Sequence, residues 1–451
     1  MDALVAALGS KVITDPNRLP AYQHDRAYDP HVVPPRAVVV AESTADVAAT
    51  LRWANENGAP VIIRGLGSSL SGGSSSHTPS IVLSLEKLTD ITVDPAHGVA
   101  IAGAGAINAD VKKAAAAHGL WYPPDPSSFE FCSIGGNVAT NAGGLCCVKY
   151  GVTRDYVLGL TVVLADGEVL TLGGKNIKDV AGLPLLDLFI GSEGILGVVT
   201  EVTVRLVPQP LPPATLVAFF PSLESASSAV VGIKSRLVPS MAELMDRTAI
   251  NAVEERLKMG LDREAEAFLV VQVDSGTGAD DEVKFIEEQC LAGGATECFF
   301  TLDPDEGEMF ITARREGIPA VEQLGPLLLE DVGVPVPQLP RLMAGINEIA
   351  ANREVTIAMV AHAGDGNTHP LLVLDPQDEA QQARAKVAYG EIMDLAISLG
   401  GTITGEHGVG RLKQPWLTGQ VGPRAYELTR QIKQLFDPNG ILNPGVIVAS
   451  D

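Results

Sequence analysis

Hydrophobic positions in the first part of the chain come mostly in short runs bounded by glycine and polar residues, a pattern typical of strands. Residues 37–40 (AVVV) form such a run, and Ser43 or Thr44 is then placed to cap the helical pattern ADVAATLRWANENG. The stretches ITVDPAHGVAIAG and GLTVVLADGEVLTLGG each predict a hairpin, the second turning at Asp166-Gly167. A proline-rich segment at 208–213 follows the next long strand and predicts a domain boundary.

Beyond that boundary, strands and amphipathic helices alternate. TLVAFF and AFLVVQV are predicted strands, and the helices SLESASSAVVGIKSRL and DDEVKFIEEQCLAGG follow them. The pattern continues with a helix around 339–351, the strands TIAMVAH and HPLLVL, and helices at 381–399 and 424–436. We expect a mostly antiparallel sheet with helices on one side. The 451 residues then divide into a helical lead-in (1–33), a first domain (34–208), a second domain (209–400) and a closing segment (401–451).

The net charge of −23 changes the picture by excluding two classes of partner. Nucleic acids and anionic membrane surfaces both select basic proteins, so neither is expected to bind. An acidic substrate stays compatible with this charge only where positive charge is gathered locally. Any anion-binding site must therefore supply its own cations.

Cysteine usage and the N-terminus bear on the compartment. The five cysteines are an odd number and form no CxxC pair, which argues against a disulfide framework and an iron–sulfur cluster. The N-terminus MDALVAALGSKVITD lacks a basic region and is read as a short amphipathic helix, and no run of 18 apolar residues occurs. We expect a cytoplasmic protein without a transmembrane segment, with peripheral membrane association left open.

Three glycine-rich loops fall within about 130 residues of one another. The first, RGLGSSLSGG at 64–73, follows a predicted strand, and such a loop lets backbone N–H groups converge on phosphate oxygens. Its spacing is not GxGxxG, because Leu70 stands where the third glycine would be, and it is not a Walker loop. One such loop alone is more often a plain connector. The presence of two more such loops, at 124–144 and 191–197, argues against interpreting all three as plain connectors.

In order and composition these loops resemble the flavin-binding domain of the vanillyl-alcohol oxidase and p-cresol methylhydroxylase superfamily. The resemblance implies an α+β protein, with a two-part FAD-binding domain of the p-cresol methylhydroxylase type and a ferredoxin-like cap domain with an antiparallel sheet. The domain 34–208 would bind FAD, 209–400 would form the substrate or cap domain, and 401–451 would return to the flavin.

By the same resemblance the first loop holds the pyrophosphate, the second lines the ribityl chain and isoalloxazine, and the third lies at the adenosine side. Some relatives attach FAD through a histidine in the first loop, but here serines follow Gly67 and His77 lies beyond, so FAD is expected to be non-covalent. The implied FAD-binding residues are Arg64, Gly65, Gly67, Ser68, Ser69, Leu70, Ser71, Gly72, Pro124, Asp125, Ser128, Gly135, Gly136, Asn137, Thr140, Asn141, Gly143, Gly144, Glu193, Gly194, Gly197, Val198, Val199 and Asn443.

A histidine pair marks the second domain in the stretch HAGDGNTH, which runs from His362 to His369. If Asp365-Gly366 is a two-residue turn, opposite residues have numbers that sum to 731, so the two imidazoles face each other about 5 Å apart. Two nitrogens so placed can hold one divalent ion, and Glu406, between glycines in GEHGVG, is a plausible third ligand. For either motif alone, polar edge histidines and a capping glutamate are the preferred interpretation. The two together favour a metal site.

These motifs, with the tail Asn443-Pro444-Gly445, resemble the FAD-linked D-2-hydroxyacid dehydrogenases, the group of D-lactate dehydrogenase, D-2-hydroxyglutarate dehydrogenase and the glycolate oxidase flavin subunit. The resemblance implies that His362, His369 and Glu406 bind a divalent metal and that His407 is the general base. Zinc is the first choice for that metal and manganese the alternative. An imidazole suits the role of base, because its ordinary pKa lies near neutrality.

The substrate carboxylate needs a cation, and relatives carry an arginine where this chain has Arg314-Arg315. A solvated arginine pair on a helix face is an equal alternative for either residue, and the sequence leaves open which one binds. Where a D-2-hydroxyglutarate enzyme would place a lysine, just ahead of DVGVP, this chain has Leu329. That departure favours a small 2-hydroxyacid such as lactate or glycolate.

The sequence thus predicts a FAD-dependent dehydrogenase of small anionic D-2-hydroxyacids. An alkyl-dihydroxyacetone-phosphate synthase-like flavin transferase is the alternative, although no phosphate pocket or acyl tunnel is identifiable. A flavin- or metal-binding protein without turnover is less attractive, because storage needs no base beside Glu406. The electron acceptor stays open among an electron-transfer flavoprotein, a quinone, a cytochrome and oxygen, and a homodimer is compatible with the sequence.

Overall fold

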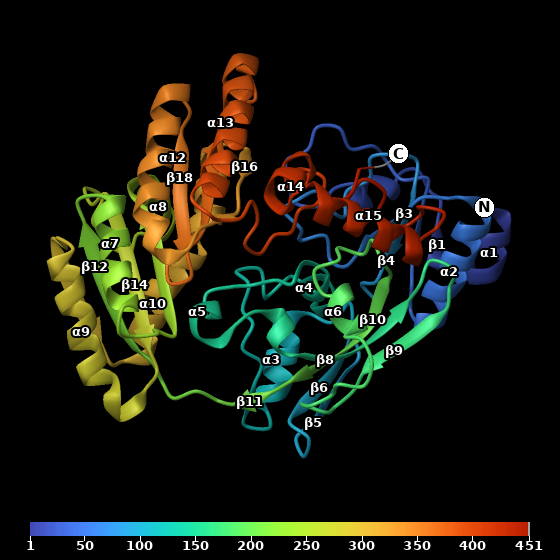
Figure 1. Ribbon diagram of the computed structural model, residues 1–451, viewed down its shortest axis with the longest axis horizontal. Helices are drawn as coiled ribbons and strands as arrows, with labels where there is room; N and C mark the ends of the chain where they lie inside the picture. The colour runs from blue at the N-terminus through green and yellow to red at the C-terminus, as the bar shows by residue number, and fades with distance from the viewer. Residues whose placement is uncertain (450–451) are drawn as a thin grey trace. The chain divides into compact units, whose positions relative to one another are not determined.

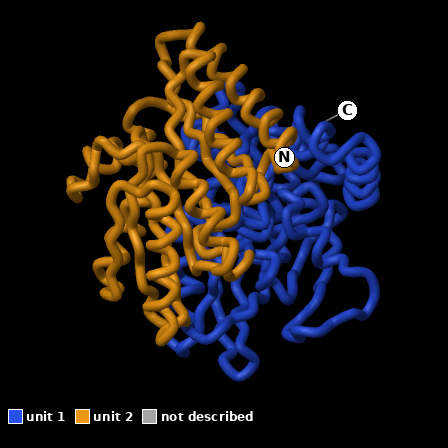
Figure 2. The backbone as a smooth tube through the Cα atoms, turned by 60° about the vertical axis from the view of Figure 1, so that its left-hand side comes forward, with its two compact units in different colours: residues 1–143, 152–209, 406–451 blue, residues 144–151, 210–405 orange. Residues whose placement is uncertain are grey.

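The computed structural model describes residues 1–449 (Figure 1). The described chain divides into two compact units, which Figure 2 colours separately. Unit 1 contains Met1–Gly143, Val152–Gln209 and the C-terminal segment from Glu406, whereas unit 2 contains Gly144–Gly151 and Pro210–Gly405. Among residues 1–449, no helix is both long and apolar enough to cross a membrane.

Unit 1 begins with a four-stranded sheet in the order β1-β2-β4-β3. Strand β4 runs parallel to β2 and β3, and β1 is antiparallel to β2. Ser43 caps the following helix by accepting from the N–H of Asp46, and Gly58 ends it in the left-handed conformation. The elements are α1 (Asp2–Leu8), β1 (Val12–Ile13), β2 (Ala37–Val40), α2 (Thr44–Asn57), β3 (Val61–Arg64) and β4 (Ile81–Ser84).

The rest of unit 1 is built on a five-stranded antiparallel sheet in the order β5-β6-β10-β8-β9. Its two outer pairs are the two predicted hairpins, and Gly167 has a positive φ in the second turn. The strands of this sheet are β5 (Ile91–Asp94), β6 (Val99–Gly103), β8 (Val157–Val163), β9 (Val169–Gly173) and β10 (Val198–Arg205). The helices of this part of unit 1 are α3 (Asn108–Ala116), α4 (Ile134–Thr140), α6 (Leu185–Phe189), α14 (Gln414–Val421) and α15 (Pro423–Phe436). Strand β7 (Leu120–Trp121) pairs separately with β11 (Val207–Pro208).

Unit 2 is organised by one antiparallel sheet in the order β15-β12-β14-β13-β18-β19-β16, and β17 also pairs with β19. The predicted antiparallel sheet is therefore confirmed. Its strands are β12 (Ala214–Phe220), β13 (Met241–Asp246), β14 (Ala267–Val273), β15 (Glu297–Thr301), β16 (Leu327–Leu329), β17 (Val332–Gly333), β18 (Ile357–His362) and β19 (Asn367–Val373).

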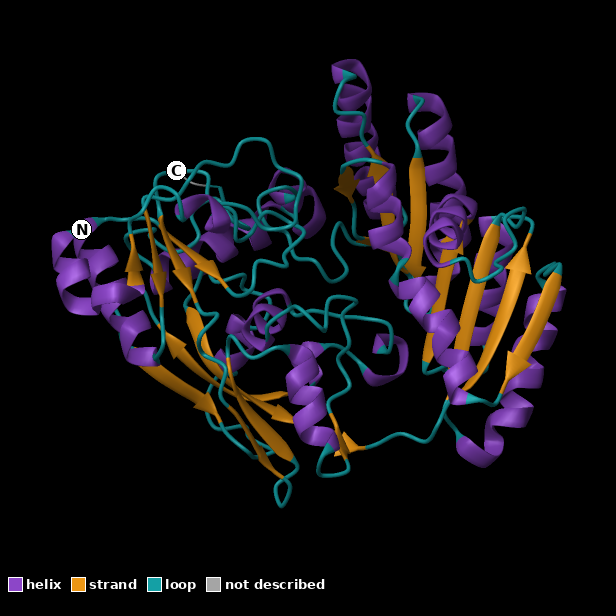
Figure 3. Cartoon of the chain, turned by 180° about the vertical axis from the view of Figure 1, so that it is seen from behind, coloured by secondary structure: helices purple, strands orange, loops and turns teal. Residues whose placement is uncertain are grey.

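Helices cover both faces of this sheet, so the expectation of helices on one side was wrong (Figure 3). Val217 and Phe219 of β12 share a core cluster with residues of α8 and α10, such as Ile250 and Ile311. Helices α7 and α9 contact the same strand, all seven residues of which are buried. The reason is visible in TLVAFF, since a continuous apolar run suits a strand buried on both faces.

The helices of unit 2 are α5 (Cys147–Tyr150), α7 (Leu223–Lys234), α8 (Arg247–Leu257), α9 (Ala279–Ala292), α10 (Pro304–Arg315), α11 (Gly317–Val321), α12 (Leu339–Arg353) and α13 (Glu379–Ser398). Short 3-10 turns lie at Gly9–Lys11, Leu19–Tyr22, Thr153–Asp155, Gly276–Gly278, Glu322–Leu324 and Val336–Gln338.

Candidate active site

The predicted histidine hairpin is formed by β18 and β19, but its register differs from the prediction. His362 pairs with Asn367, and Val360 pairs with His369, so opposite residues sum to 729. Four residues, 363–366, form the turn, in which the N–H of Gly366 donates to the carbonyl of His362 at 3.1 Å. The two histidines are therefore diagonal neighbours and not a directly opposed pair.

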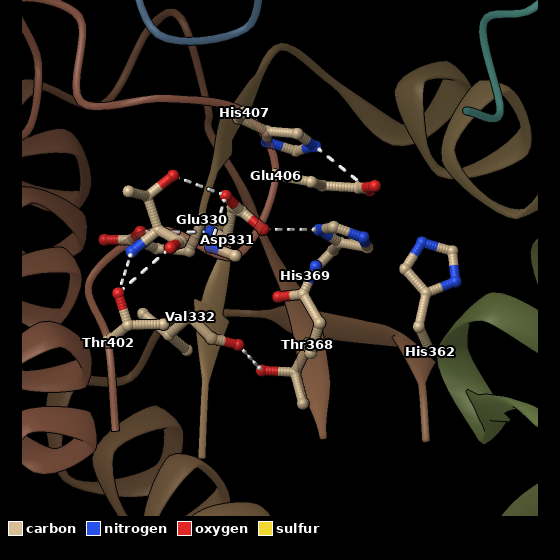
Figure 4. Close-up of polar contacts among 12 residues, drawn as sticks. Glu330, Asp331, Val332, His362, Thr368, His369, Thr402, Glu406 and His407 are labelled. Carbon is tan, nitrogen blue, oxygen red and sulfur yellow. Dashed lines mark hydrogen bonds and ion pairs between the residues drawn. The ribbon is translucent and has the colours of Figure 1, made fainter. Parts of the chain in front are cut away.

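This shift of register does not separate the two imidazole rings. Moving a strand by two residues returns each side chain to the same face, because side chains alternate with a period of two. The two rings remain on one face with centroids 5.1 Å apart, and both side chains are buried (Figure 4). The structure thus brings the two predicted imidazoles together.

Glu243 orients one of these rings. It lies in β13, which pairs with β18, and its carboxylate is within 2.8 and 2.9 Å of Nδ1 of His362. A carboxylate at Nδ1 is usual for histidines that bind a metal through Nε2. This contact is compatible with the expected role of His362 as a ligand.

Asp331 fixes the backbone that leads to Glu406. Its Oδ2 accepts from Oγ1 of Thr404 at 2.7 Å and from the N–H of Gly405 at 2.9 Å, while its Oδ1 lies 3.7 Å from Nδ1 of His369. Glu406 is the next residue, so its position follows locally from this anchored backbone. Asp331 itself is fully buried.

The rings of His362 and His369 lie side by side in unit 2, and Glu406 and His407 are the first two residues of the last segment of unit 1. Two imidazoles and a carboxylate form a donor set that suits zinc or manganese. Nε2 of His407 is 3.8 Å from the Glu406 carboxylate, so the expected base is adjacent to an expected ligand (Figure 4). The residues present therefore fit a divalent ion.

The two arginines have different surroundings. Arg314 is buried, and its Nη2 is 2.9 Å from the Glu243 carboxylate that also holds His362. Arg315 is 2.7 Å from Glu308 on the same helix. Arg314 thus belongs to the histidine site, and Arg315 belongs to the flank of α10.

In unit 1 the three glycine loops meet. A Cβ at Gly65 would lie 2.4 Å from Oγ of Ser133, so the first loop touches the middle of the second. The N–H of Gly191 donates to Val138, and the N–H of Glu193 donates to Ala139, which joins the third loop to the second. Backbones of small residues gathered in this way suit a large, flat, phosphate-bearing ligand.

Several expected FAD-binding side chains have structural partners in unit 1. Asn443 accepts from the N–H of Ile63 and donates to the carbonyl of Glu193. Asn137 contacts Asn108 and Cys132, while Asn141 ends α4 and accepts from Arg154.

Other residues of the expected FAD-binding set have different surroundings. Arg64 donates to the carbonyl of His24, and its pKa is lowered by burial. Val198 and Val199 point into hydrophobic cores, so only their backbone groups remain for a ligand.

Two site residues were missed from the sequence, Glu243 and Asp331. Both are fully buried carboxylates beside the histidines. A signal was available for Glu243, since it is a charged residue inside the apolar strand MAELM. Its partner lies 119 residues away, and only the pairing of β13 with β18 shows which residue it serves.

Comparison with known families agrees with this arrangement. Residues 35–173 match an FAD binding domain, and residues 210–447 match the C-terminal domain of FAD linked oxidases. The second match covers more than half of the chain. The chain belongs to the FAD-linked oxidases. It is therefore an FAD-linked oxidoreductase, as the glycine loops predicted.

Relatives with established names lie within this family. The chain is 38% identical to glycolate oxidase subunit GlcD of Bacillus subtilis over 421 residues, which is 92% of this chain and 90% of the relative. It is 37% identical to D-lactate dehydrogenase of Archaeoglobus fulgidus over 441 residues, 95% of each chain. Both support FAD-linked oxidation of a hydroxyacid.

Solved structures agree with this fold. p-Cresol methylhydroxylase with bound substrate matches with a TM-score of 0.83 at 15% identity, covering 100% of this chain and 96% of that one. Alkyldihydroxyacetonephosphate synthase matches with a TM-score of 0.74 at 17% identity, covering 98% and 84%. At these identities the likeness is one of fold, and it confirms the predicted p-cresol methylhydroxylase type.

Proposed function

We propose that this FAD-linked oxidase is a dehydrogenase that converts a small D-2-hydroxyacid, of the lactate or glycolate type, to the 2-oxoacid. The observation that carries the proposal is the buried pair His362 and His369 in unit 2, with Nδ1 of His362 held by the buried Glu243. A purely structural histidine pair has no need of a buried carboxylate that orients one of its rings. The names of the relatives support the same substrate class.

The roles of the residues follow from their chemistry. His362, His369 and Glu406 would hold the divalent ion, and His407 would take the proton of the substrate hydroxyl. When bound, the metal would supply Lewis-acid polarisation of that hydroxyl, and non-covalent FAD would supply the acceptor for the carbinol hydride. Water exclusion would come from the buried surroundings of the two histidines.

Arg314 is the proposed partner of the substrate carboxylate. Its guanidinium lies beside Glu243, which places it in the same buried cluster as His362. A guanidinium carries five N–H donors in a planar fork, and the ion pair with Glu243 involves Nη2. The overall charge of −23 repels anions, so a metal ion and Arg314 would supply the local positive charge.

Leu329 is the proposed limit on the substrate side chain. It pairs with Leu371 in β19, two residues beyond His369, and packs against the hydrophobic cluster of unit 2. An apolar residue there offers no partner to a second carboxylate. A substrate with a short or apolar side chain is therefore favoured over a dicarboxylate.

The proposal is tested by anaerobic mixing of the FAD- and metal-loaded protein with a panel of D- and L-2-hydroxyacids. Loss of the oxidised flavin absorbance with D-lactate or glycolate is expected, with a much slower response to L-lactate and to D-2-hydroxyglutarate. Acid denaturation should release FAD into solution. A protein that none of these acids reduces would overturn the proposal, and one reduced best by D-2-hydroxyglutarate would overturn the role of Leu329.

A further inference from the structure

The carboxylate of Glu193 holds the turn that follows His407. Oε1 accepts from the N–H of Val409 at 2.7 Å, and Oε2 accepts from the N–H of Gly410 at 2.8 Å. Both oxygens thus receive backbone donors from one short segment of the chain. All of these residues lie in unit 1, and Glu193 is buried.

The backbone of Glu193 is fixed as firmly as its side chain. Its N–H donates to the carbonyl of Ala139 at 2.8 Å, and its carbonyl accepts from Nδ2 of Asn443 at 2.7 Å. Its φ of +49° is uncommon for a residue with a side chain and is retained only where the surroundings impose it. Every polar group of this residue therefore has a defined partner.

The turn is held from a second direction by Ser71 in the first glycine loop. Oγ of Ser71 donates to the carbonyl of His407 at 3.2 Å, and its own carbonyl accepts from the N–H of Arg411 at 3.0 Å. Gly408 has a φ of +87°, and a Cβ there would lie 2.8 Å from the Glu193 carboxylate. The close approach of carboxylate and turn thus depends on a glycine next to His407.

Burial raises the pKa of Glu193 to about 7, and the donated N–H groups of Val409 and Gly410 oppose that rise. Lys413 acts in the same direction as those N–H groups. A surface turn can be capped by an exposed side chain without desolvating a carboxyl group. Placing this group in the interior is costly, which argues that a defined geometry of the turn matters.

We propose that Glu193 is a positioning residue for His407, acting through the backbone of the 408–410 turn, and that the FAD contact expected for its side chain is not its role. The inference rests on the proposed function, in which His407 is the base. Misplacing a catalytic group by about 1 Å can cost about 100-fold in rate. Glu193 would therefore affect the rate of substrate oxidation more than the binding of substrate or FAD.

The test uses the full-length, FAD- and metal-loaded protein with the variants Glu193→Gln, Glu193→Ala and Gly408→Ala. Glu201→Gln is the control, because Glu201 is an exposed carboxylate of β10 in the same unit and contacts Thr161 only through a 3.4 Å hydrogen bond. Flavin reduction by D-lactate is followed over a range of concentrations. Amide hydrogen exchange of peptides covering 407–412 is measured by mass spectrometry in the absence of substrate.

We expect full FAD content in all variants and faster exchange in 407–412 for the three test variants. Their limiting rate of flavin reduction should fall about 10- to 100-fold, least for Glu193→Gln, which keeps one acceptor oxygen, while half-saturation changes less than about threefold. Gly408→Ala displaces the carboxylate without removing it, so it repeats the test if Glu193→Ala fails to fold. The control should match the wild type in both measurements.

Three results would overturn the inference: loss of FAD on substitution of Glu193, unchanged exchange in 407–412, or faster exchange with an unchanged limiting rate. If the wild-type protein is reduced by no hydroxyacid, the proposed function fails separately. The exchange measurement then decides alone whether Glu193 holds the turn.

Discussion

Glu243 joins His362 to Arg314 through a single buried carboxylate, with 2.8 Å to Nδ1 of the histidine and 2.9 Å to Nη2 of the arginine. One side chain thereby orients an expected metal ligand and an expected substrate-binding group. A carboxylate behind a ligating histidine also raises the basicity of the other ring nitrogen.

Replacing Glu243 by Gln should weaken metal binding about 10- to 100-fold, since the amide orients the ring poorly and is less basic. The affinity is measured by competition with a chelator of known strength, with FAD content followed in parallel. Glu308→Gln is the matched control, because Glu308 also pairs with an arginine but lies on the exposed side of α10. Equal metal affinity in the two variants would contradict the role of Glu243 in orienting a metal ligand.

Arg314→Lys should lower kcat/KM for D-lactate about 10- to 100-fold, with most of the effect in KM. Lysine keeps the positive charge beside Glu243 but loses the planar fork that binds a carboxylate through two N–H groups. Arg315→Lys, the adjacent change on the same helix, should stay within about twofold of the wild type. A larger effect of Arg315→Lys than of Arg314→Lys would reverse the assignment.

The spacing of Arg314 from other residues of α10 distinguishes it from Arg315. Gly307, Ile311 and Arg314 are buried and follow each other at i, i+4 and i+7, which is one face of a helix. Arg315 is turned away by the helical rotation. Since arginine is ordinarily placed on the solvent side, the pattern of polar and apolar residues left the choice between the two arginines open.

The hairpin shows a different limit of prediction. The sequence HAGDGNTH identifies the two histidines and a turn between them, and both are present. The length of the turn is set by contacts that the segment itself does not reveal, such as the bond from the N–H of Val334 to the carbonyl of Gly366. The two histidines were correctly predicted to lie together despite this error, because the observed register differs by two residues and keeps both rings on one face.

Gly366→Ala tests the importance of that turn for the site. Gly366 has a φ of +87°, and a Cβ there would lie 2.1 Å from the carbonyl oxygen of Val334, so the turn must move. Gly400→Ala is the matched control, since its φ is +74° but nothing lies within 4 Å of its Cβ position. Left-handed backbone alone costs about 1–2 kcal/mol.

We expect Gly400→Ala to lose about that much free energy of unfolding and to retain its metal. Gly366→Ala should lose more, and its metal content should fall because the histidines flank the moved turn. Denaturant unfolding and metal analysis give both quantities. Retention of full metal content by Gly366→Ala would show that the site tolerates movement of the hairpin.

The carboxyl group of Asp246 should make the stability of the protein depend on pH. Its carboxylate caps α8 by accepting from the N–H of Ala249, and burial raises its pKa from 3.8 to about 7, with Glu266 acting in the same direction. The folded state therefore binds the proton more tightly than the unfolded state between these values. The contribution of Asp246 to the free energy of unfolding therefore falls as pH rises through that window, by about 1.4 kcal/mol for each unit of pKa difference at most.

Asp246→Asn removes the titration and keeps a good cap, since Asn and Asp are equally favoured at this position. The decline in free energy of unfolding between pH 5.5 and pH 8 should therefore be smaller in the variant, and both values stay above the isoelectric point near 4.7. Asp303→Asn is the control, because Asp303 caps α10 from an exposed position. Urea unfolding at the two pH values measures the difference, and parallel declines in wild type and Asp246→Asn would show that the Asp246 carboxyl group does not govern this pH dependence.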